Sequence, residues 1–184
     1  ETYATGRDYT EATPWHYRFF VPHDVNGLVQ NYPSKDEFIK ALDDLFTLEA
    51  EMAIEVSDVT GLKGQYAHGN EPSHHMAYLF SYVGQPWKTQ KYTRELLDEM
   101  YAPTPDGIIG NEDAGQMSAW YVLSALGFYS VCPGSNEFVL TTPLFDEAVI
   151  KLANGKTLTI KAAGAAKNHY VKDVVLNGKK IDVN

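Results

Sequence analysis

The chain has 184 residues, of which 44% are hydrophobic and 12% are aromatic, which is enough to bury one sizeable core. Its net charge of −9 argues against a nucleic-acid partner, because phosphate binding needs an excess of Lys and Arg. The single cysteine, Cys132, excludes an intrachain disulfide and a zinc-finger type of thiolate site. No stretch of the sequence is long and apolar enough to cross a bilayer.

Residues from about 14 to 130 carry helix signals. Residues 23–32 predict a short helix or turn that stops before Pro33. Ser34, with Glu37 three positions later, forms a capping-box pattern, and apolar residues follow at helical spacing. We therefore expect a helix over residues 35–48.

Three further helices are predicted at 72–84, 86–101 and 114–127. Pro72 and Pro86 suit the first helical position, and Gly84 and Gly127 suit helix ends. The residues expected on the inner face of the middle helix are Trp87, Leu96, Leu97 and Met100. Successive helices joined by polar loops are typical of a helical bundle or toroid.

Residues 131–184 carry strand signals instead. Short β runs occur at 137–143, 147–152, 156–162 and 172–184. Asn154-Gly155 and Asn177-Gly178 are strong signals for tight hairpin turns. The sequence therefore predicts an α+β fold, mainly helical over 1–130, followed by a small antiparallel β region over 131–184.

The first candidate site residue is Glu11, which precedes Thr13-Pro14 and the bulky Trp15. A carboxyl group packed beside an aromatic ring loses water and keeps its proton more readily, which suits a proton donor. Trp15 could also stack on a sugar face. The structural alternative is that Glu11 is solvated and the aromatic residues belong to the core.

Two further clusters contain histidines. His23-Asp24 suits either a site or a structural histidine beside a helix N-cap aspartate. Residues 68–75 hold His68, Asn70, Glu71, His74 and His75, without the H-E-x-x-H register of zinc proteases. The oxygen ligands offered by the Asn-Glu pair suit Ca²⁺ better than Zn²⁺.

The fourth cluster is Asn111-Glu112-Asp113, in a glycine-flanked turn before a helix. In an extended turn Asn111 and Asp113 point one way and Glu112 the other. The structural alternative makes Asp113 a helix N-cap. In a toroid, alternate loops converge on one face, so these acidic clusters could meet. Two carboxylic acids with an aromatic rim are the minimal requirement for glycoside hydrolysis.

Three stretches closely resemble the signatures of glycoside hydrolase family 92, the calcium-dependent, inverting, exo-acting α-mannosidases. They read EATPWHYRFFVPHDVNGL, GNEPSHHMAYLF and GNEDAGQMSAWYVLSALGFYSVCPG. The resemblance covers essentially the whole chain. It implies that residues 1–130 are the C-terminal portion of an (α/α)₆ toroid, and that 131–184 pack back on a β-sandwich. With no Met or targeting signal in residues 1–20, we expect a fragment or a mature form.

The same resemblance implies roles for individual residues. Glu11 matches the proposed general acid, although Ala12 stands where Gly is common and His16 where Gln is common. Asp113 matches the proposed general base, and Asn111 an amide where some members have a second carboxylate. Asn70 and Glu71 match the part that holds Ca²⁺. The residues expected to contact substrate are Trp15, His16, His23 and Asp24.

The implied activity is α-1,2-mannosidase type hydrolysis of terminal mannose on mannose-containing glycans. Relatives are usually exported, so a periplasmic or cell-surface location is implied. The expected partners within the same protein are the sandwich and the early helices, with self-association as an alternative. Two other functions stay open: a non-catalytic carbohydrate-binding or interaction module, and a metallohydrolase using His68, His74 and His75.

Overall fold

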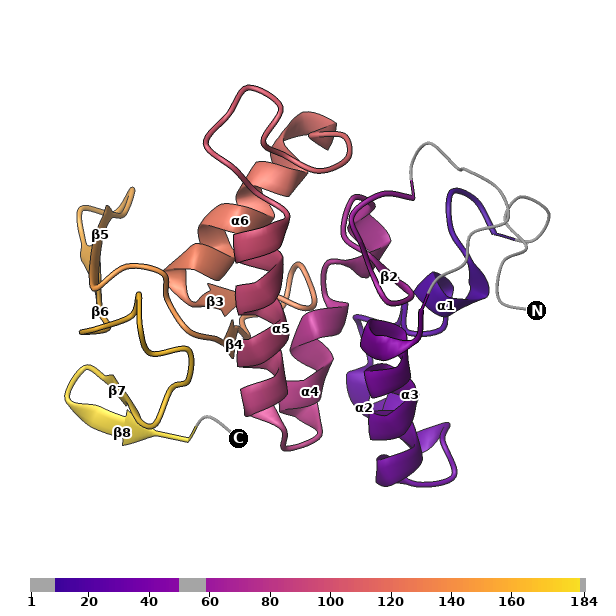
Figure 1. The fold of residues 1–184 in the computed structure, drawn as a ribbon. Helices are drawn as coiled ribbons and strands as arrows, with labels where there is room; N and C mark the ends of the chain where they lie inside the picture. Colours follow the sequence, from indigo (N-terminus) through magenta and orange to yellow (C-terminus); the bar gives the residue numbers. More distant parts are fainter. Residues whose placement is uncertain (1–8, 50–58, 183–184) are drawn as a thin grey trace.

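A computed structural model of the chain describes residues 9–49 and 59–182. Helices lie in its first two thirds and small antiparallel strand pairs dominate the last third, which confirms the predicted α+β fold. Figure 1 shows the helices side by side, with β5 to β8 beyond α6 at one end. Within the described residues no helix has the length and hydropathy needed to cross a membrane.

The first helices begin where their polar caps predict. Helix α1 spans Pro14–Tyr17, α2 spans Val25–Gln30 and α3 spans Lys35–Thr47. Ser34 Oγ accepts a hydrogen bond from the Glu37 backbone N–H at 3.1 Å, which satisfies one of the free donors of the first turn. The short helix or turn predicted over 23–32 and the helix predicted over 35–48 are therefore confirmed.

Helices α5 (Pro86–Glu99) and α6 (Gln116–Leu126) are also confirmed, with Pro86 in the first turn of α5 and Gly127 as the left-handed cap of α6. The inner face of α5 differs in one residue from the prediction. Leu96 and Leu97 are buried, but Trp87 is 51% exposed, so placing it on the inner face was wrong. Trp87 instead lies beside the Lys88 ammonium, 5.3 Å from the centre of its ring.

The continuous helix predicted over 72–84 is broken. The chain forms two 3-10 turns, η1 (Glu71–Ser73) and η2 (Met76–Tyr78), before α4 (Leu79–Tyr82). The Tyr78 N–H binds the carbonyl of His75, three residues back, while the His74 carbonyl accepts from Trp120 Nε1 at 3.0 Å. A tertiary hydrogen bond from α6 thus occupies a carbonyl that a regular helix would use internally.

The strands pair in four two-stranded antiparallel sheets within the described residues. Strands β1 (Leu62–Lys63) and β2 (Tyr66–Ala67) form a short hairpin that the sequence did not predict, and β3 (Phe128–Tyr129) pairs with β4 (Val139–Leu140). Gly64 turns the first hairpin at φ +61°, where an added Cβ would lie 2.6 Å from the Phe46 carbonyl carbon. The hairpin therefore packs directly on the end of α3.

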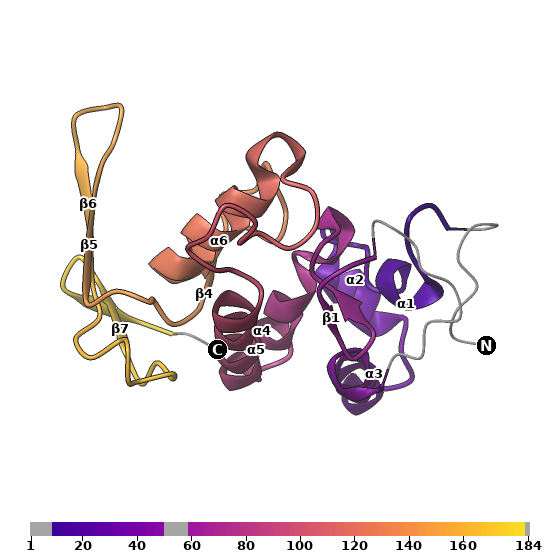
Figure 2. The ribbon, with the colours of Figure 1, turned by 45° about the horizontal axis from the view of Figure 1, so that its top comes forward.

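The last two hairpins confirm the strand predictions. Strand β5 (Glu147–Lys151) pairs with β6 (Thr157–Lys161), and β7 (Val174–Leu176) pairs with β8 (Lys179–Ile181). Asn177 and Gly178 both have positive φ, at 51° and 79°, as a two-residue type I′ turn requires. Figure 2 shows the β5–β6 hairpin extending away from the helices.

The core lies between the helices and is rich in aromatic side chains. Phe46, on α3, stacks between Tyr66 and Tyr92, with ring centroids 4.8 and 4.2 Å away. Trp120, on α6, is fully buried and connects this core to the 68–75 segment. The toroid and the boundary at residue 130 stay predictions.

Candidate active site

Three segments that are far apart in the sequence meet at one end of the helical region. Asn70 Nδ2 donates a hydrogen bond to the Glu11 carbonyl oxygen at 2.8 Å, across 59 positions. Gly110 lies against Gly69, so closely that a Cβ added at Gly110 would be 2.5 Å from the Gly69 carbonyl oxygen. Glu11, Asn70-Glu71 and the 110–113 loop are therefore neighbours, as the sequence analysis expected.

Glu71 is the electrostatic centre of this group. Burial raises the pKa of its carboxyl, and a hydrogen bond with Asp113 and the negative charges of Asp113 and Glu11 raise it further. Its Oε1 atom is buried and has no hydrogen-bond partner. A buried carboxylate oxygen without a donor is rare in folded proteins, since leaving it unpaired costs free energy.

The backbone is strained where the two predicted acid–base residues lie. Glu11 has φ 52° and Asp113 has φ 44°, two of the four non-glycine residues with positive φ in the described chain. Ala114 follows at φ 56° and Gly115 at φ 94°. Such left-handed residues cost about 1–2 kcal/mol each and persist only where surrounding contacts hold them, often at functional sites.

Glu112 has a separate, structural task. Its carboxylate accepts hydrogen bonds from the Ser118 N–H at 3.0 Å and the Ser118 hydroxyl at 2.7 Å, and these bonds lower its pKa. Glu112 therefore binds the first turn of α6, whereas the helix N-cap position belongs to Gly115. Asp113 is exposed, so the structural alternative that made it the N-cap is wrong.

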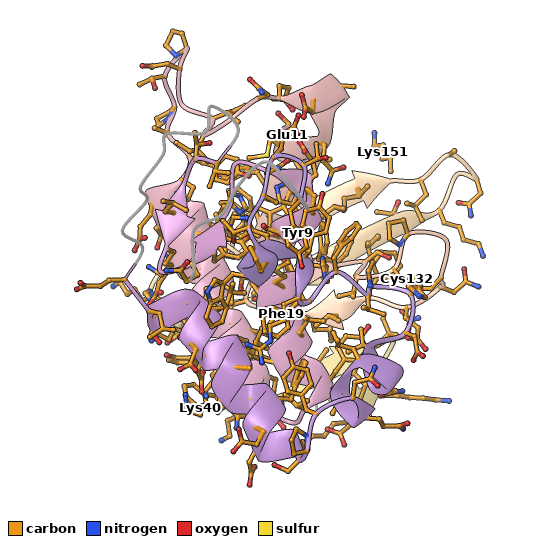
Figure 3. The ribbon with its side chains drawn as sticks, turned by 90° about the vertical axis from the view of Figure 1, so that its right-hand side faces the viewer. Tyr9, Glu11, Phe19, Lys40, Cys132 and Lys151 are labelled. Atoms are coloured by element: carbon orange, nitrogen blue, oxygen red, sulfur yellow. The ribbon has the colours of Figure 1, made fainter. Side chains whose placement is uncertain are left out.

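Glu11 and Asn111 are both exposed. In the view of Figure 3 Glu11 lies above Tyr9 and Phe19. The burial of Glu11 against an aromatic ring, expected from the neighbouring Trp15, is therefore absent in the described structure. Asn111 lies in the same loop as Asp113 and makes interactions of its own.

The residues expected to contact substrate lie on α1 and at the start of α2. Trp15 packs partly buried on the core, with the Arg18 guanidinium 5.5 Å from its ring centre. His16 is only 3% exposed: Nδ1 accepts from the Thr13 N–H at 3.1 Å and Nε2 donates to the Gln65 carbonyl at 2.8 Å. Burial lowers its pKa. These contacts give His16 a structural role in joining α1 to the β1–β2 turn.

His23 and Asp24 are exposed and adjacent. Asp24 Oδ1 accepts a hydrogen bond from the Gly27 N–H at 2.8 Å, so Asp24 is the N-cap of α2, the structural role that the sequence left open. No hydrogen bond or ion pair joins this pair to Glu71 in the described part of the chain. Contact of Trp15, His16, His23 and Asp24 with substrate stays a prediction.

The three buried histidines form a rigid support beneath the site. His68 donates from Nε2 to the Tyr101 hydroxyl at 2.8 Å and accepts at Nδ1 from the Tyr66 hydroxyl at 2.9 Å. His75 donates to the Phe19 carbonyl at 2.8 Å. Burial lowers the pKa of each, and that of His74 to about 4. Hydrogen bonds to protein groups occupy these rings, which does not favour a histidine-based zinc site.

The residues that connect these histidines to α6 were not predicted from the sequence. Gln116 Nε2 donates to His74 Nδ1 at 3.2 Å, and Trp120 donates to the His74 carbonyl. Tyr101, at an isolated bridge with Ile108, binds both His68 and the Met117 carbonyl. Amide and aromatic residues inside helical runs look like ordinary core residues. For Gln116, the only available signal was its position three residues after Asp113.

The groups that could hold a cation are oxygen donors. No set of three or more His, Cys, Asp or Glu side chains is arranged as metal ligands in residues 9–49 and 59–182. The unpartnered Oε1 of Glu71, with carboxylates of Asp113 and Glu11 nearby, nevertheless fits one ligand of a hard cation, because a positive charge would offset both burial and repulsion. The donor set of Asn70 and Glu71 suits Ca²⁺.

Comparison with protein families gives one match. The family model described as the glycosyl hydrolase family 92 catalytic domain matches residues 1–184. A protein of Arthroderma benhamiae named an uncharacterized secreted glycosidase is 29% identical over 188 residues, covering 100% of this chain and 21% of the relative.

Solved structures show the same similarity. A family GH92 α-mannosidase from Bacteroides thetaiotaomicron, in complex with mannoimidazole, superposes with a TM-score of 0.89 at 44% identity, over 95% of this chain and 23% of that chain. An inverting family GH92 mannosidase from the same organism gives a TM-score of 0.83 at 37% identity, over 98% of this chain and 26% of that chain. The chain thus spans about a quarter of the length of these relatives.

Proposed function

Because the chain belongs to glycosyl hydrolase family 92, we propose that the full-length protein removes terminal α-linked mannose from glycans, as an inverting, calcium-assisted α-1,2-mannosidase. The observation that carries this proposal is the cluster around Glu71. It combines a buried carboxylate oxygen without a partner, a second carboxylate from Asp113 and a third from Glu11, drawn from three segments. The names of the solved relatives supply the sugar.

In the proposed reaction Glu11 donates a proton to the leaving oxygen while Asp113 accepts a proton from a water molecule on the opposite face of the sugar. An inverting enzyme holds two such carboxyl groups about 6.5–9.5 Å apart, which leaves room for the water. Asn111 orients that water but cannot take its proton. The exposed position of both carboxyl groups, on turns rather than in the core, keeps them accessible to a glycan.

Asn70 and Glu71 would hold the Ca²⁺. When bound, the cation supplies a positive charge that grips vicinal sugar hydroxyls and favours a distorted ring close to the oxocarbenium-like transition state. The protein's part is to fix the two ligands. The Asn70 amide donates a hydrogen bond to the Glu11 carbonyl at 2.8 Å. This bond fixes the plane of the amide and so the direction of the Asn70 side-chain oxygen.

We extend the proposal to architecture and location. Residues 1–130 would form part of an (α/α)₆ toroid, and 131–184 would pack on a β-sandwich of the same protein. Export to the periplasm or cell surface would bring the enzyme to its glycans. The relative named as a secreted glycosidase supports this location.

The test is hydrolysis of α-1,2-mannobiose by the full-length protein, with the anomer of the released mannose read by NMR before and after a chelator. We expect β-mannose first, and loss of activity on chelation that added CaCl₂ restores. Asp113→Asn should lower kcat by about 10²–10⁴-fold, because it removes a general base. Glu71→Gln should raise the calcium concentration needed for activity.

Glu112→Gln is the matched control for Asp113→Asn. It neutralises a carboxylate in the same loop, and its amide oxygen can still accept from Ser118. We expect near-wild-type kcat for this control. Full activity in Asp113→Asn, retention of the substrate's anomeric configuration, or mannoside binding without turnover would each contradict the proposal.

A further inference from the structure

Several hydrogen bonds join the two segments that carry the proposed calcium ligand and the proposed base, and one of them links the side chains of Gln116 and His74. Glu71 lies three residues before His74, and Asp113 lies three residues before Gln116. Gln116 Nε2 donates to His74 Nδ1 at 3.2 Å, across 42 positions. The spacing of three residues is the same on both sides, so this bond lies three positions along the chain from each of the two carboxylates.

His74 is held firmly enough to serve as an anchor. It is 2% exposed, its Nε2 donates to the His68 carbonyl at 3.1 Å, and its own carbonyl accepts from Trp120 Nε1 at 3.0 Å. With Nε2 as the donor, Nδ1 is the acceptor that Gln116 needs. The ring therefore has one orientation and one tautomer.

Without this bond, Gln116 would be the more mobile residue of the two. It opens α6 directly after Asp113, Ala114 and Gly115, which all have positive φ, and such a run has little intrinsic preference for its conformation. Its amide has one further partner, the Tyr129 hydroxyl at 3.4 Å. The bond to His74, at 3.2 Å, is the shorter of the two and the one that connects the start of α6 to the 68–75 segment.

We propose that Gln116 and His74 are positioning residues, which fix the distance between Asp113 and Glu71 although neither contacts substrate. The roles of base and calcium ligand rest on the proposed function. Displacing a catalytic group by about 1 Å can cost up to 10²-fold in rate, so this indirect role has a measurable effect.

The test compares two variants of the full-length protein. Gln116→Met keeps the length of the side chain but removes its donor, and Tyr129→Phe removes the weaker partner while keeping the ring that stacks on Tyr78 at 4.9 Å. We expect Gln116→Met to lower kcat about 10-fold, to leave KM within about twofold, and to raise the calcium needed for half-maximal activity about 10-fold. Tyr129→Phe should stay near wild type in all three.

Hydrogen exchange, read by mass spectrometry, supplies a readout that does not depend on activity. Peptides covering 110–117 and 69–74 should exchange faster in Gln116→Met than in Tyr129→Phe. If Gln116→Met is poorly folded, Gln116→Asn serves instead, because its amide is one methylene shorter and cannot reach Nδ1. Equal kcat, calcium requirement and exchange in the two variants overturns the proposal.

These outcomes separate the two proposals. A wild-type protein without mannosidase activity contradicts the proposed function, while exchange still decides whether Gln116 and His74 hold the two segments together. An active wild type with unchanged Gln116→Met kinetics contradicts the positioning role alone. Lower thermal stability of Gln116→Met, with unchanged kcat and calcium requirement, assigns the bond to folding and also overturns the positioning role.

Discussion

Gly110→Ala is the most direct perturbation of the contact between the two glycine-flanked loops. Gly110 has φ +76°, and the added Cβ would lie 2.5 Å from the Gly69 carbonyl oxygen and 2.8 Å from its Cα. Real Cβ atoms almost never approach within 3.0 Å. Because both neighbours are backbone atoms, the loops must separate, and Asp113 must move away from Glu71.

The magnitude follows from two contributions. A left-handed conformation costs an alanine about 1 kcal/mol relative to glycine, and the displaced backbone raises the total to about 3 kcal/mol. Gly134→Ala is the matched control, because Gly134 has φ +94° with no atom within 4 Å of an added Cβ. It should cost about 1 kcal/mol and no activity.

The assay is calorimetric Tm together with kcat on α-1,2-mannobiose, for the full-length protein. A loss of about 1 kcal/mol lowers the Tm of a domain of 150–250 residues by about 2–4 °C, and that of a longer cooperative unit by less. We expect Gly110→Ala to lower Tm at least twice as much as Gly134→Ala, and to lower kcat about 10-fold or more. Equal Tm changes and equal kcat in the two variants would refute the close contact between Gly69 and Gly110.

Two other predictions concern the buried support of the site. Burial lowers the pKa of His74 from 6.5 to about 4. As the pH falls below about 6.5, His74 therefore binds a proton in the unfolded chain but not in the folded chain. The free energy of unfolding decreases as a result, until the folded chain also binds the proton at about pH 4. Between pH 7 and pH 5 this decrease amounts to about 2 kcal/mol. In His74→Asn, the free energy of unfolding measured with urea should depend less on pH. An unchanged pH dependence argues against a buried neutral ring. Trp120→Phe removes the donor to the His74 carbonyl and should destabilise the protein by about 1–3 kcal/mol, whereas a neutral effect on urea unfolding would contradict that hydrogen bond.

Local signals predicted most of the fold. Ser34 and Pro86 marked helix starts and Asn177-Gly178 marked a hairpin, because each of these depends on its immediate neighbours. The broken 71–82 segment could not be predicted. It coincides with a hydrogen bond from the indole of Trp120, which lies 46 positions from the carbonyl that it binds.

The site was predicted in part. The meeting of Glu11, Glu71 and Asp113 follows from their similar loop positions, and the structure brings the three together. The structural role of His16 depends on the Gln65 carbonyl, 49 positions away, and no local pattern indicates it. Long-range hydrogen bonds of this kind are set by packing, which a periodicity argument does not capture.

The hydrogen bond from Asn70 to the Glu11 carbonyl has a consequence for the order of folding. It closes a loop of 59 positions, and the Gln116–His74 bond closes another of 42. Closing such loops costs chain entropy before the contacts that offset this cost are formed. We therefore expect these bonds to form after the helices. A ligand that touches all three segments therefore binds only the fully folded chain and stabilises it in proportion to the logarithm of its concentration. If mannoside and calcium bind as proposed, adding them during refolding would stabilise the product of the last step rather than the first.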